Sequence, residues 1–183
     1  MIEAQQLLVS MLIDVFGADC WNDSVEETAR RVLAFWEEYK PIDEIDFTFT
    51  TFPANVNQLV VVRDIEFSSL CEHHLLPYYG KAHVGYIPNE LMVGVSKVPR
   101  LVDFWAKRPS VQEILTANIA SDMKHRLAAM GVAVVIEARH TCMACRGVRK
   151  YNGVMVTSEM RGVFLTAPAA RAEFLAMIGK ETI

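Results

Sequence analysis

A cysteine and two adjacent histidines lie close together in the stretch SLCEHHLLPYYG, residues 69–80. Cys71 and His74 are three positions apart, so in a helical turn both side chains point to one face and can bind one ion. A thiolate and an imidazole are ligands that suit zinc. This spacing alone is weak evidence, because a buried thiol beside an exposed histidine would explain it equally well.

A second group of possible ligands lies in the stretch RHTCMACRG. We expect a strand there, and His140 and Cys142, two positions apart in a strand, would point to the same face of the sheet. If that face meets Cys71 and His74, a third ligand completes a metal site.

Two different metal sites can be assembled from these parts. A closed structural zinc site would use four ligands: Cys71, His74, Cys142 and Cys145. Without Cys145, the fourth position is left to water, whose pKa zinc lowers from about 15.7 to about 7. In that open site His73 and His140 remain free beside the ion and can move protons. Spacing alone does not choose between the two sites.

The sequence between the two groups favours the open site, because a purely structural zinc would not need residues that bind anions or read a base. Lys97 and Arg100 stand near an expected helix start, where backbone N–H groups already favour phosphate, and Arg146 follows the second group. Gln112 and Glu113 fall in the first turn of the next expected helix, where an acid is expected on dipole grounds alone. The sharper interpretation is that the carboxylate accepts two parallel hydrogen bonds from the N1–H and exocyclic amine of guanine.

Composition limits the class of protein. The 183 residues, 52% apolar and 22% charged, are enough for one sizeable domain. A formal net charge of −4 argues against a general nucleic-acid binder. The first 17 residues carry an acid at Glu3 and apolar residues at helical spacing, which indicates an amphipathic helix rather than an export signal. No apolar run approaches the ~20 residues of a membrane span. We expect a soluble, cytoplasmic protein whose cysteines are thiols or metal ligands.

Hydrophobic periodicity predicts an α+β fold. Two N-terminal helices come first, and the second begins at Ser24 with Glu27 completing a capping box. Strands on both sides of the stretch 69–80 are followed by two helices between 96 and 130, with Gly131 as the expected helix stop. Two more strands and a C-terminal helix complete the chain. The order is helices, then ββααββ, then a helix, with an antiparallel sheet covered by helices on one face.

From about Glu27 to Ile178 the chain resembles GTP cyclohydrolase I. The resemblance is carried by the long segments VRDIEFSSLCEHHLLPYYGKAHVGYIP, VGVSKVPRLVDFWAKRPSVQE, EARHTCMACRGV and VTSEMRGVF, which occur in the family's order and at similar distances. It implies a tunnelling fold, in which ββααββ units assemble into a pentameric barrel and two pentamers stack into a decamer with shared active sites. It also implies one domain over 1–183, with N-terminal helices in 1–40 and a catalytic core over 55–178.

The resemblance further implies roles for individual residues. The family's zinc ligands fall on Cys71, His74 and Cys142, which makes Cys145 a non-ligand. Its catalytic residues fall on His73, His140 and Ser96. Its substrate contacts fall on Glu113, Gln112, Lys97, Arg100, Arg146 and, across a subunit boundary, Arg31. The implied reaction is zinc-dependent hydrolysis of GTP to 7,8-dihydroneopterin triphosphate and formate, at the start of pterin, folate or 7-deazaguanine synthesis. The chain departs from the family pattern at Ala29, Pro99 and Ile114.

Three other functions fit part of this pattern. In a zinc nucleobase deaminase Glu72 would move the proton and Cys145 would be a further ligand, but the proline expected before Cys142 is missing. A non-catalytic zinc-stabilised binding protein would lose its zinc when Cys145 is replaced. A related tunnelling-fold pterin or deazaguanine enzyme would generally lack the combined Cys-Glu-His-His and His-x-Cys pattern.

Overall fold

The computed structural model describes residues 2–43 and 47–179 and divides into two compact units, Met1–Lys40 and Pro41–Ile183. Among the described residues, no helix combines the length and the apolar character that crossing a membrane requires.

The first unit is a pair of helices, α1 (Ile2–Phe16) and α2 (Val25–Glu37), joined through a short 3-10 helix, η1 (Ala18–Cys20). The side chain of Ser24 accepts a hydrogen bond from the backbone N–H of Glu27 at 3.3 Å, which confirms the predicted N-cap. The reciprocal half of the predicted capping box is absent, because Asp23 Oδ1 accepts from the Ser24 N–H at 2.8 Å and the Glu27 carboxylate pairs with Arg30.

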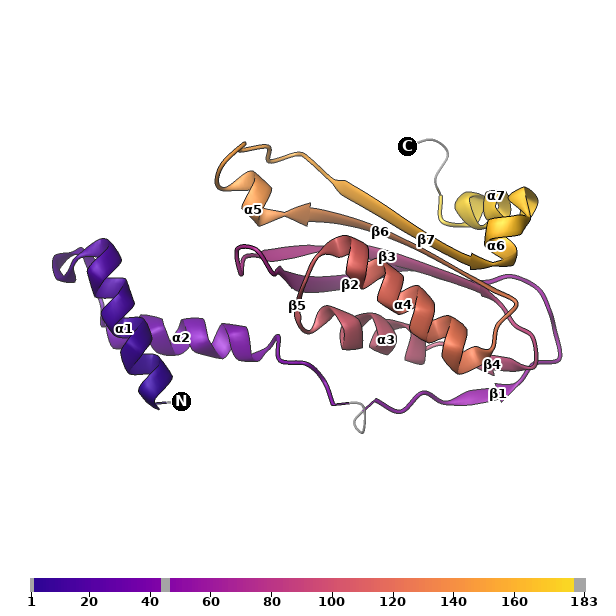
Figure 1. Ribbon diagram of the computed structural model, residues 1–183, viewed down its shortest axis with the longest axis horizontal. Helices are drawn as coiled ribbons and strands as arrows, with labels where there is room; N and C mark the ends of the chain where they lie inside the picture. The colour runs from indigo at the N-terminus through magenta and orange to yellow at the C-terminus, as the bar shows by residue number, and fades with distance from the viewer. Residues whose placement is uncertain (1, 44–46, 180–183) are drawn as a thin grey trace. The chain divides into compact units, whose positions relative to one another are not determined.

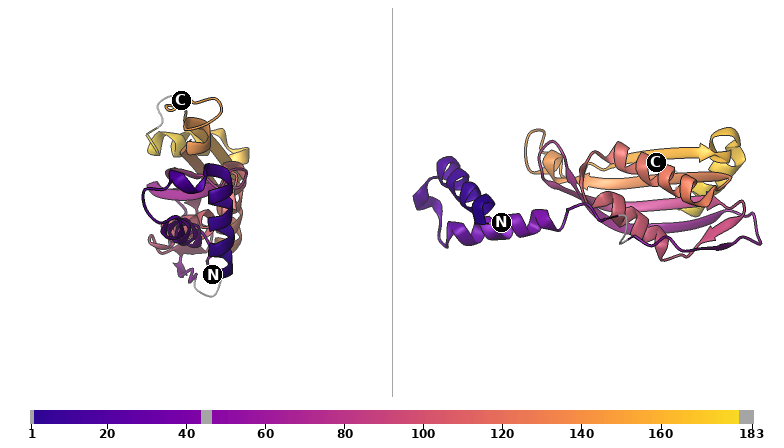
Figure 2. Two further views of the ribbon diagram at one scale, coloured as in Figure 1. Left: turned by 90° about the vertical axis from the view of Figure 1, so that its left-hand side faces the viewer. Right: turned by 60° about the horizontal axis from the view of Figure 1, so that its bottom comes forward.

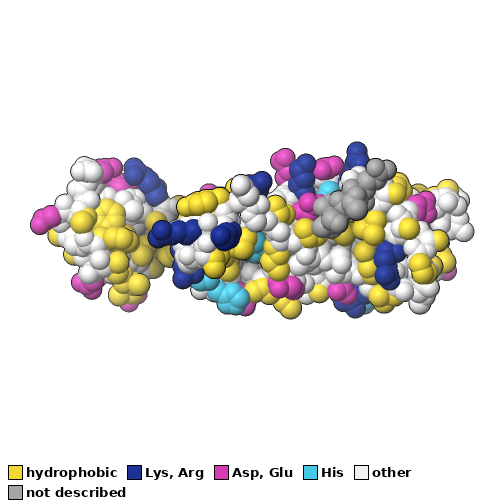
Figure 3. Space-filling view, turned by 90° about the horizontal axis from the view of Figure 1, so that it is seen from above, with side chains coloured by type: hydrophobic (Ala, Val, Ile, Leu, Met, Phe, Trp, Pro, Cys, Tyr) yellow, Lys and Arg dark blue, Asp and Glu magenta, His cyan; other side chains and the backbone are white. Residues whose placement is uncertain are grey.

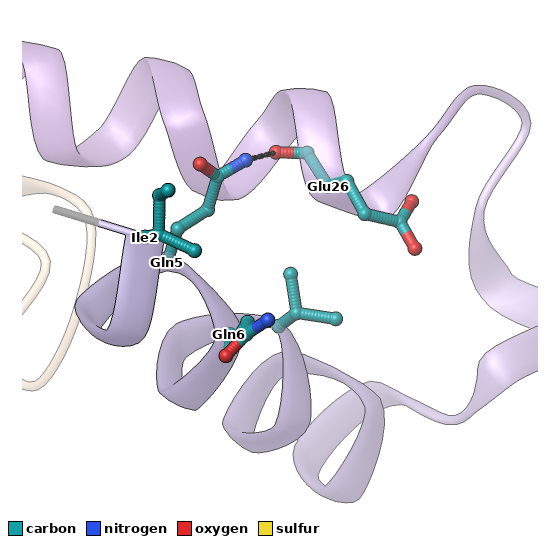
Figure 4. Close-up of a pocket in the computed structure, with 5 residues that line it drawn as sticks. Ile2, Gln5, Gln6 and Glu26 are labelled. Carbon is teal, nitrogen blue, oxygen red and sulfur yellow. Dashed lines mark hydrogen bonds between the residues drawn. The ribbon is translucent and has the colours of Figure 1, made fainter.

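An open hollow of about 430 Å³ lies between α1 and α2 and is lined by Ile2, Gln5, Gln6, Val9 and Glu26. The Gln5 amide bridges the two helices by donating to the backbone oxygen of Glu26 at 3.0 Å (Figure 4). None of the described residues of α1 is buried, and α2 buries Ala29. The residues that line it include one carboxylate and no thiol or imidazole, so this hollow is not the predicted metal site.

The second unit is built on a five-stranded sheet with the order β5-β2-β3-β6-β7 (Figure 1). Its strands are β2 (Val60–Cys71), β3 (Pro77–Ile87), β5 (Pro109–Ser110), β6 (Gly131–His140) and β7 (Met155–Gly162). All neighbours are antiparallel except β2 and β5, which pair in parallel at Leu70 and Cys71. A separate two-stranded sheet pairs β1 (Thr51–Pro53) with β4 (Leu91–Val93). The long strands and their order confirm the predicted ββααββ unit, whereas the short strands β1, β4 and β5 were not predicted.

Helices α3 (Lys97–Ala106) and α4 (Gln112–Leu127) cover one face of this sheet (Figures 1 and 2). Alternation along β6 sends Val132, Val134 and Ile136 into the core beneath them. The intervening Ala133 and Val135 point to the opposite face and pack with a second core. That core comes from the C-terminal helices α6 (Val163–Thr166) and α7 (Pro168–Met177). Helices therefore cover both faces at this end of the sheet, which differs from the predicted single covered face.

Two local predictions are wrong. Helix α4 ends at Leu127, with Ala128 as a left-handed C-cap at φ 46°, whereas Gly131 begins β6. Gly131 is needed there for another reason, since a Cβ at this position would lie 2.9 Å from the Phe164 ring. Strand β6 ends at His140 and the short helix α5 (Thr141–Ala144) follows, so Cys142 is not on a strand.

Candidate metal centre

The turn after β2 brings the first two possible ligands together. Cys71 is the last residue of β2, and its N–H donates to the backbone oxygen of Leu76 at 2.9 Å. Its carbonyl accepts from the N–H groups of His74 at 3.3 Å and Leu75 at 2.8 Å. This closed turn confirms the helical-turn geometry predicted for Cys71 and His74.

The third ligand comes from α5. Strands β3 and β6 are paired as far as Tyr78 and His140, and the Thr141 hydroxyl then donates to the Pro77 carbonyl at 2.6 Å, which fastens α5 beside the turn. As a result, ligand atoms of Cys71, His74 and Cys142 all lie within 4.8 Å of one another. The predicted convergence therefore occurs, although a helix rather than a strand positions Cys142.

The two thiols lie in an environment that suits a cation. Cys71 is buried, and burial raises the pKa of the Cys142 thiol, with the neighbouring Cys71 raising it further. A divalent ion would offset both effects, because it stabilises two adjacent thiolates. Cys145 is exposed and its thiol donates to the Thr141 carbonyl at 2.9 Å. Among the described residues it is not part of the ligand group.

The two histidines predicted to move protons have different surroundings. His73 is exposed, with Nδ1 3.9 Å from Cys71 Sγ and Nε2 3.8 Å from a Glu72 carboxylate oxygen. His140 is half-buried and stacks on the Tyr78 ring, with centroids 4.5 Å apart and planes 3° from parallel. Burial lowers the pKa of His140, and the charge of Glu113 opposes that shift.

The start of α4 lies beside the end of β2. Cys71 pairs with Ser110 in β5, and the N–H of Glu72 donates to the Ser110 carbonyl at 3.3 Å. Helix α4 begins two residues later with Gln112, which is fully buried, and Glu113, which is exposed.

The guanidinium of Arg146 lies against Nε2 of His74, so a cation is present directly beside the ligand group. Figure 3 shows histidine side chains in cyan close to Lys and Arg side chains in dark blue on one face of the molecule. A site with two thiols, three imidazoles, a carboxylate and a guanidinium can hold a metal ion, move protons and bind an anion.

A protein-family model described as GTP cyclohydrolase I matches residues 5–179. The chain belongs to this family. A GTP cyclohydrolase 1 from Sulfurihydrogenibium sp. (strain YO3AOP1) is 45% identical over 170 residues, covering 93% of this chain and 91% of that protein. Another, from Hydrogenobaculum sp. (strain Y04AAS1), is 41% identical over 180 residues, covering 97% of this chain and 99% of that protein. The apo crystal structure of the archaeosine synthase QueF-Like has a TM-score of 0.48 and 16% identity, covering 57% of this chain and 93% of that one.

One predicted catalytic residue, Ser96, and two predicted substrate contacts, Lys97 and Arg100, lie away from the ligand group of this GTP cyclohydrolase I chain. Ser96, Lys97 and Arg100 stand at the start of α3, whereas the end of α3 leads into β5 beside Cys71. A helix of 10 residues is about 15 Å long. The remaining predicted contact, Arg31, belongs to the first unit, where it lies 3.8 Å from carboxylate oxygens of both Asp23 and Glu27.

Sequence reasoning missed Tyr78 and two threonines. Tyr78 is fully buried under His140, and burial raises its pKa to about 12. Thr116 and Thr157 bond to each other at 2.7 Å and both contact Gln112. The alternation in β3 indicates that Tyr78 points inward, but its stacking on His140 depends on the pairing of distant strands.

Proposed function

We propose that this enzyme hydrolyses GTP to 7,8-dihydroneopterin triphosphate and formate, with one zinc ion held by Cys71, His74 and Cys142. The observation that carries the proposal is the convergence of three ligand atoms within 4.8 Å from two distant parts of the chain. Membership of the GTP cyclohydrolase I family supports GTP as the substrate.

The ligand group fits zinc better than a hard cation, since its donors are two sulfurs and one imidazole nitrogen. Three protein ligands are typical of catalytic zinc sites, whereas structural sites usually have four. The exposure of Cys145 and its hydrogen bond to Thr141 support the open arrangement. When bound, zinc supplies Lewis acidity that makes water a nucleophile near neutral pH.

We assign proton transfer to His73 and His140. His73 is exposed beside the ligand group and is suited to protonate N7 as the five-membered ring of guanine opens. His140 is assigned, together with Ser96 contributed by a neighbouring copy of the chain, to the protons that move during ribose rearrangement and ring reclosure. Burial favours the neutral imidazole of His140, which is the form that accepts a proton.

Substrate binding is assigned to the start of α4 and to basic residues. The exposed Glu113 carboxylate would accept hydrogen bonds from the N1–H and exocyclic amine of guanine. The neighbouring Gln112 side chain is buried below the surface at this point. Arg146 would bind the triphosphate next to His74. Holding guanine and phosphates at once fixes C8 of the base beside the ligand group.

Lys97, Arg100 and Ser96 are assigned to a substrate bound on a neighbouring copy, because within one chain they lie at the opposite end of α3 from the ligand group. The sheet has edges that such a copy could pair with. Within the described part of the chain, β7 is a terminal strand, and β5 covers only Leu70 and Cys71 of β2. Pairing these edges in succession would give the pentameric barrel, and a decamer of two pentamers would bring in Arg31.

The reaction is tested by incubating zinc-loaded protein with GTP, with and without a chelator, and measuring formate and a fluorescent pterin after oxidation. Both products are expected without chelator and neither with it. His73→Ala should keep its zinc and lose ring opening, whereas His125→Ala, an exposed residue on α4, should keep both. Release of ammonia without formate, or no product from a zinc-loaded assembled sample, would contradict the proposal.

The shared site is tested by mixing two inactive variants. Lys97→Ala chains and Cys142→Ala chains, unfolded and reassembled together, should regain part of the activity, because some sites then combine an intact ligand group with an intact lysine. Mixtures that stay as inactive as the two separate variants would place Lys97 in the same chain's site.

A further inference from the structure

The side chain of Gln112 is fully buried and makes hydrogen bonds on both sides of its amide. Its Nε2 lies 3.0 Å from the Ile136 carbonyl, 3.1 Å from the Met155 carbonyl and 3.0 Å from the Thr157 hydroxyl. Its Oε1 lies 2.8 Å from Nε2 of His140. These contacts occupy the NH2 group and one of the two lone pairs of Oε1, and the fully buried side chain exposes no surface to a bound base.

The orientation of this amide follows from the chemistry of its neighbours. Backbone carbonyls only accept hydrogen bonds, so the NH2 group must face Ile136 and Met155, because the reverse orientation would place three oxygens together. The amide oxygen therefore faces His140. Since an amide oxygen cannot donate, Nε2 of the imidazole must carry the hydrogen of this bond.

The same bond determines which nitrogen of His140 is available. A neutral imidazole carries one N–H, so with the hydrogen on Nε2 the lone pair is on Nδ1. Stacking on Tyr78 at 4.5 Å fixes the plane of the ring, and the Gln112 bond fixes its rotation within that plane. Two contacts thus hold His140 in one orientation and one tautomer.

Glu113 stands next to Gln112 but faces differently. Adjacent residues on a helix point about 100° apart, and here Gln112 is buried whereas Glu113 is exposed. The side chain that can reach a base is therefore that of Glu113.

We propose that Gln112 is a positioning residue that holds His140 in the Nε2–H tautomer and presents its Nδ1 lone pair to the substrate. The inference rests on the proposed role of His140 in proton transfer. Gln112 touches no substrate atom and acts only through the imidazole. The hydrogen bonds from its NH2 group to the carbonyls of Ile136 and Met155 connect the start of α4 to β6 and β7. They also keep the amide from rotating.

The first test is a double-variant cycle of Gln112→Met and His140→Ala. Methionine keeps the length of the side chain and removes both hydrogen-bonding groups. For Gln112→Met we expect kcat to fall about 10–100-fold, with an unchanged KM for GTP and a full zinc content. The double variant should be no slower than His140→Ala alone, because Gln112 then has nothing to position. A raised KM with normal kcat would assign Gln112 to base reading, and losses that multiply would show independent roles. Either result would overturn the proposal.

Thr157→Val is the matched control for packing. It removes one partner of the Gln112 amide but leaves the two carbonyls and the bond to His140. We expect its kcat to stay within about twofold of the unchanged protein, because the tautomer is set by the remaining contacts. If Thr157→Val lowered kcat as much as Gln112→Met does, the hydrogen bonds around Gln112 would be needed for folding rather than for positioning His140, and the proposal would be overturned.

The second test needs neither turnover nor a folded Gln112 variant. Nitrogen-15 spectra of histidine-labelled full-length protein, sedimented for solid-state measurement, report which ring nitrogen carries hydrogen, and the signal missing from His140→Asn identifies His140. In the neutral imidazole we expect the hydrogen on Nε2 and none on Nδ1. A hydrogen on Nδ1 with a bare Nε2 would overturn the proposal. If the tautomer is as expected but GTP is not hydrolysed, the proposed function fails and the positioning of His140 stands.

Discussion

The two ends of the five-stranded sheet are used in different ways. At the end where β6 begins, Ala133 and Val135 lie under Phe164 and Phe174, and both faces of the sheet are buried. At the end where β6 finishes, the strand is followed directly by the ligand group, and its last residues are partly exposed or exposed. One strand therefore contributes to the core at its start and to the proposed chemistry at its end.

The sequence of β6 accounts for this difference. Its first six residues, GVAVVI, are all buried and apolar, as in a strand covered on both faces. From Glu137 onward polar residues return, and Arg139 and His140 complete the strand. Substitutions at the two ends should therefore separate stability from activity.

The largest effect is expected at the metal end, from Cys142→Ala. Removing one of three ligands should abolish zinc binding and lower kcat/KM at least about 1000-fold, because the Lewis acid is lost, while the fold is kept. Zinc content and formate release check this. Cys145→Ala is the matched control and should retain both, since this exposed thiol is outside the ligand group. Loss of zinc from the control would indicate a closed four-ligand site.

The next effect is expected at the apolar end, from Phe174→Ala. Removing this fully buried ring leaves a cavity and should lower the free energy of unfolding by about 3–5 kcal/mol. Urea unfolding at a fixed protein concentration measures the change. Protein that remains folded should keep its zinc and its kcat. Leu165→Ala, 59% exposed in neighbouring α6, should cost much less. Equal costs for the two variants would refute the packing described for this end.

A smaller effect is expected from Glu113→Gln. An amide offers only one acceptor where the carboxylate offers two, so kcat/KM for GTP should fall about 10–100-fold, the equivalent of one bond to a charged group. The preference for GTP over ITP, which lacks the exocyclic amine, should shrink at the same time. The ratio of kcat/KM for the two nucleotides is the measurement, with Ile114→Ala, an exposed neighbour, as control. An unchanged ratio would remove Glu113 from base recognition.

The smallest effect is expected from Tyr78 in alkaline solution. Burial raises its pKa to about 12 in the folded protein, above the ordinary value of 10.0. Below pH 10 both states keep the proton, so stability is unaffected there. As the pH rises from about 10 towards 12, the unfolded chain loses the proton first, and stability falls by up to about 1.4 kcal/mol per pH unit. Tyr78→Phe should remove this part of the pH dependence between about pH 10 and 12, whereas Tyr151→Phe, 65% exposed, should not.

Most of the fold could be predicted from local pattern. Helical spacing and alternation gave the ββααββ order, and the turn that joins Cys71 to His74 followed from a spacing of three. The short strand β5 could not be predicted, because two residues carry no periodicity and its pairing with β2 depends on tertiary contacts. The second covered face was missed for a related reason. A fully apolar run such as GVAVVI does not reveal what lies on each side.

The convergence of Cys71, His74 and Cys142 was predicted. The strand expected to carry Cys142 was wrong, because the short helix α5 carries it. The surroundings of Gln112 could not be predicted. A glutamine in the first turn of a helix is usually solvated, and only the pairing of β6 with β7 places two carbonyls against its amide. Sequence spacing identified the side chains, whereas their hydrogen-bond partners came from strands distant in the sequence.

The most direct test of the central claim is a zinc titration of chelator-treated, metal-free protein while formate release from GTP is followed. We predict no formate without metal, a rate that rises with added zinc, and saturation at one ion per chain. Formate release at the full rate by the metal-free protein would contradict the assignment of the Cys71, His74 and Cys142 group as the reaction centre.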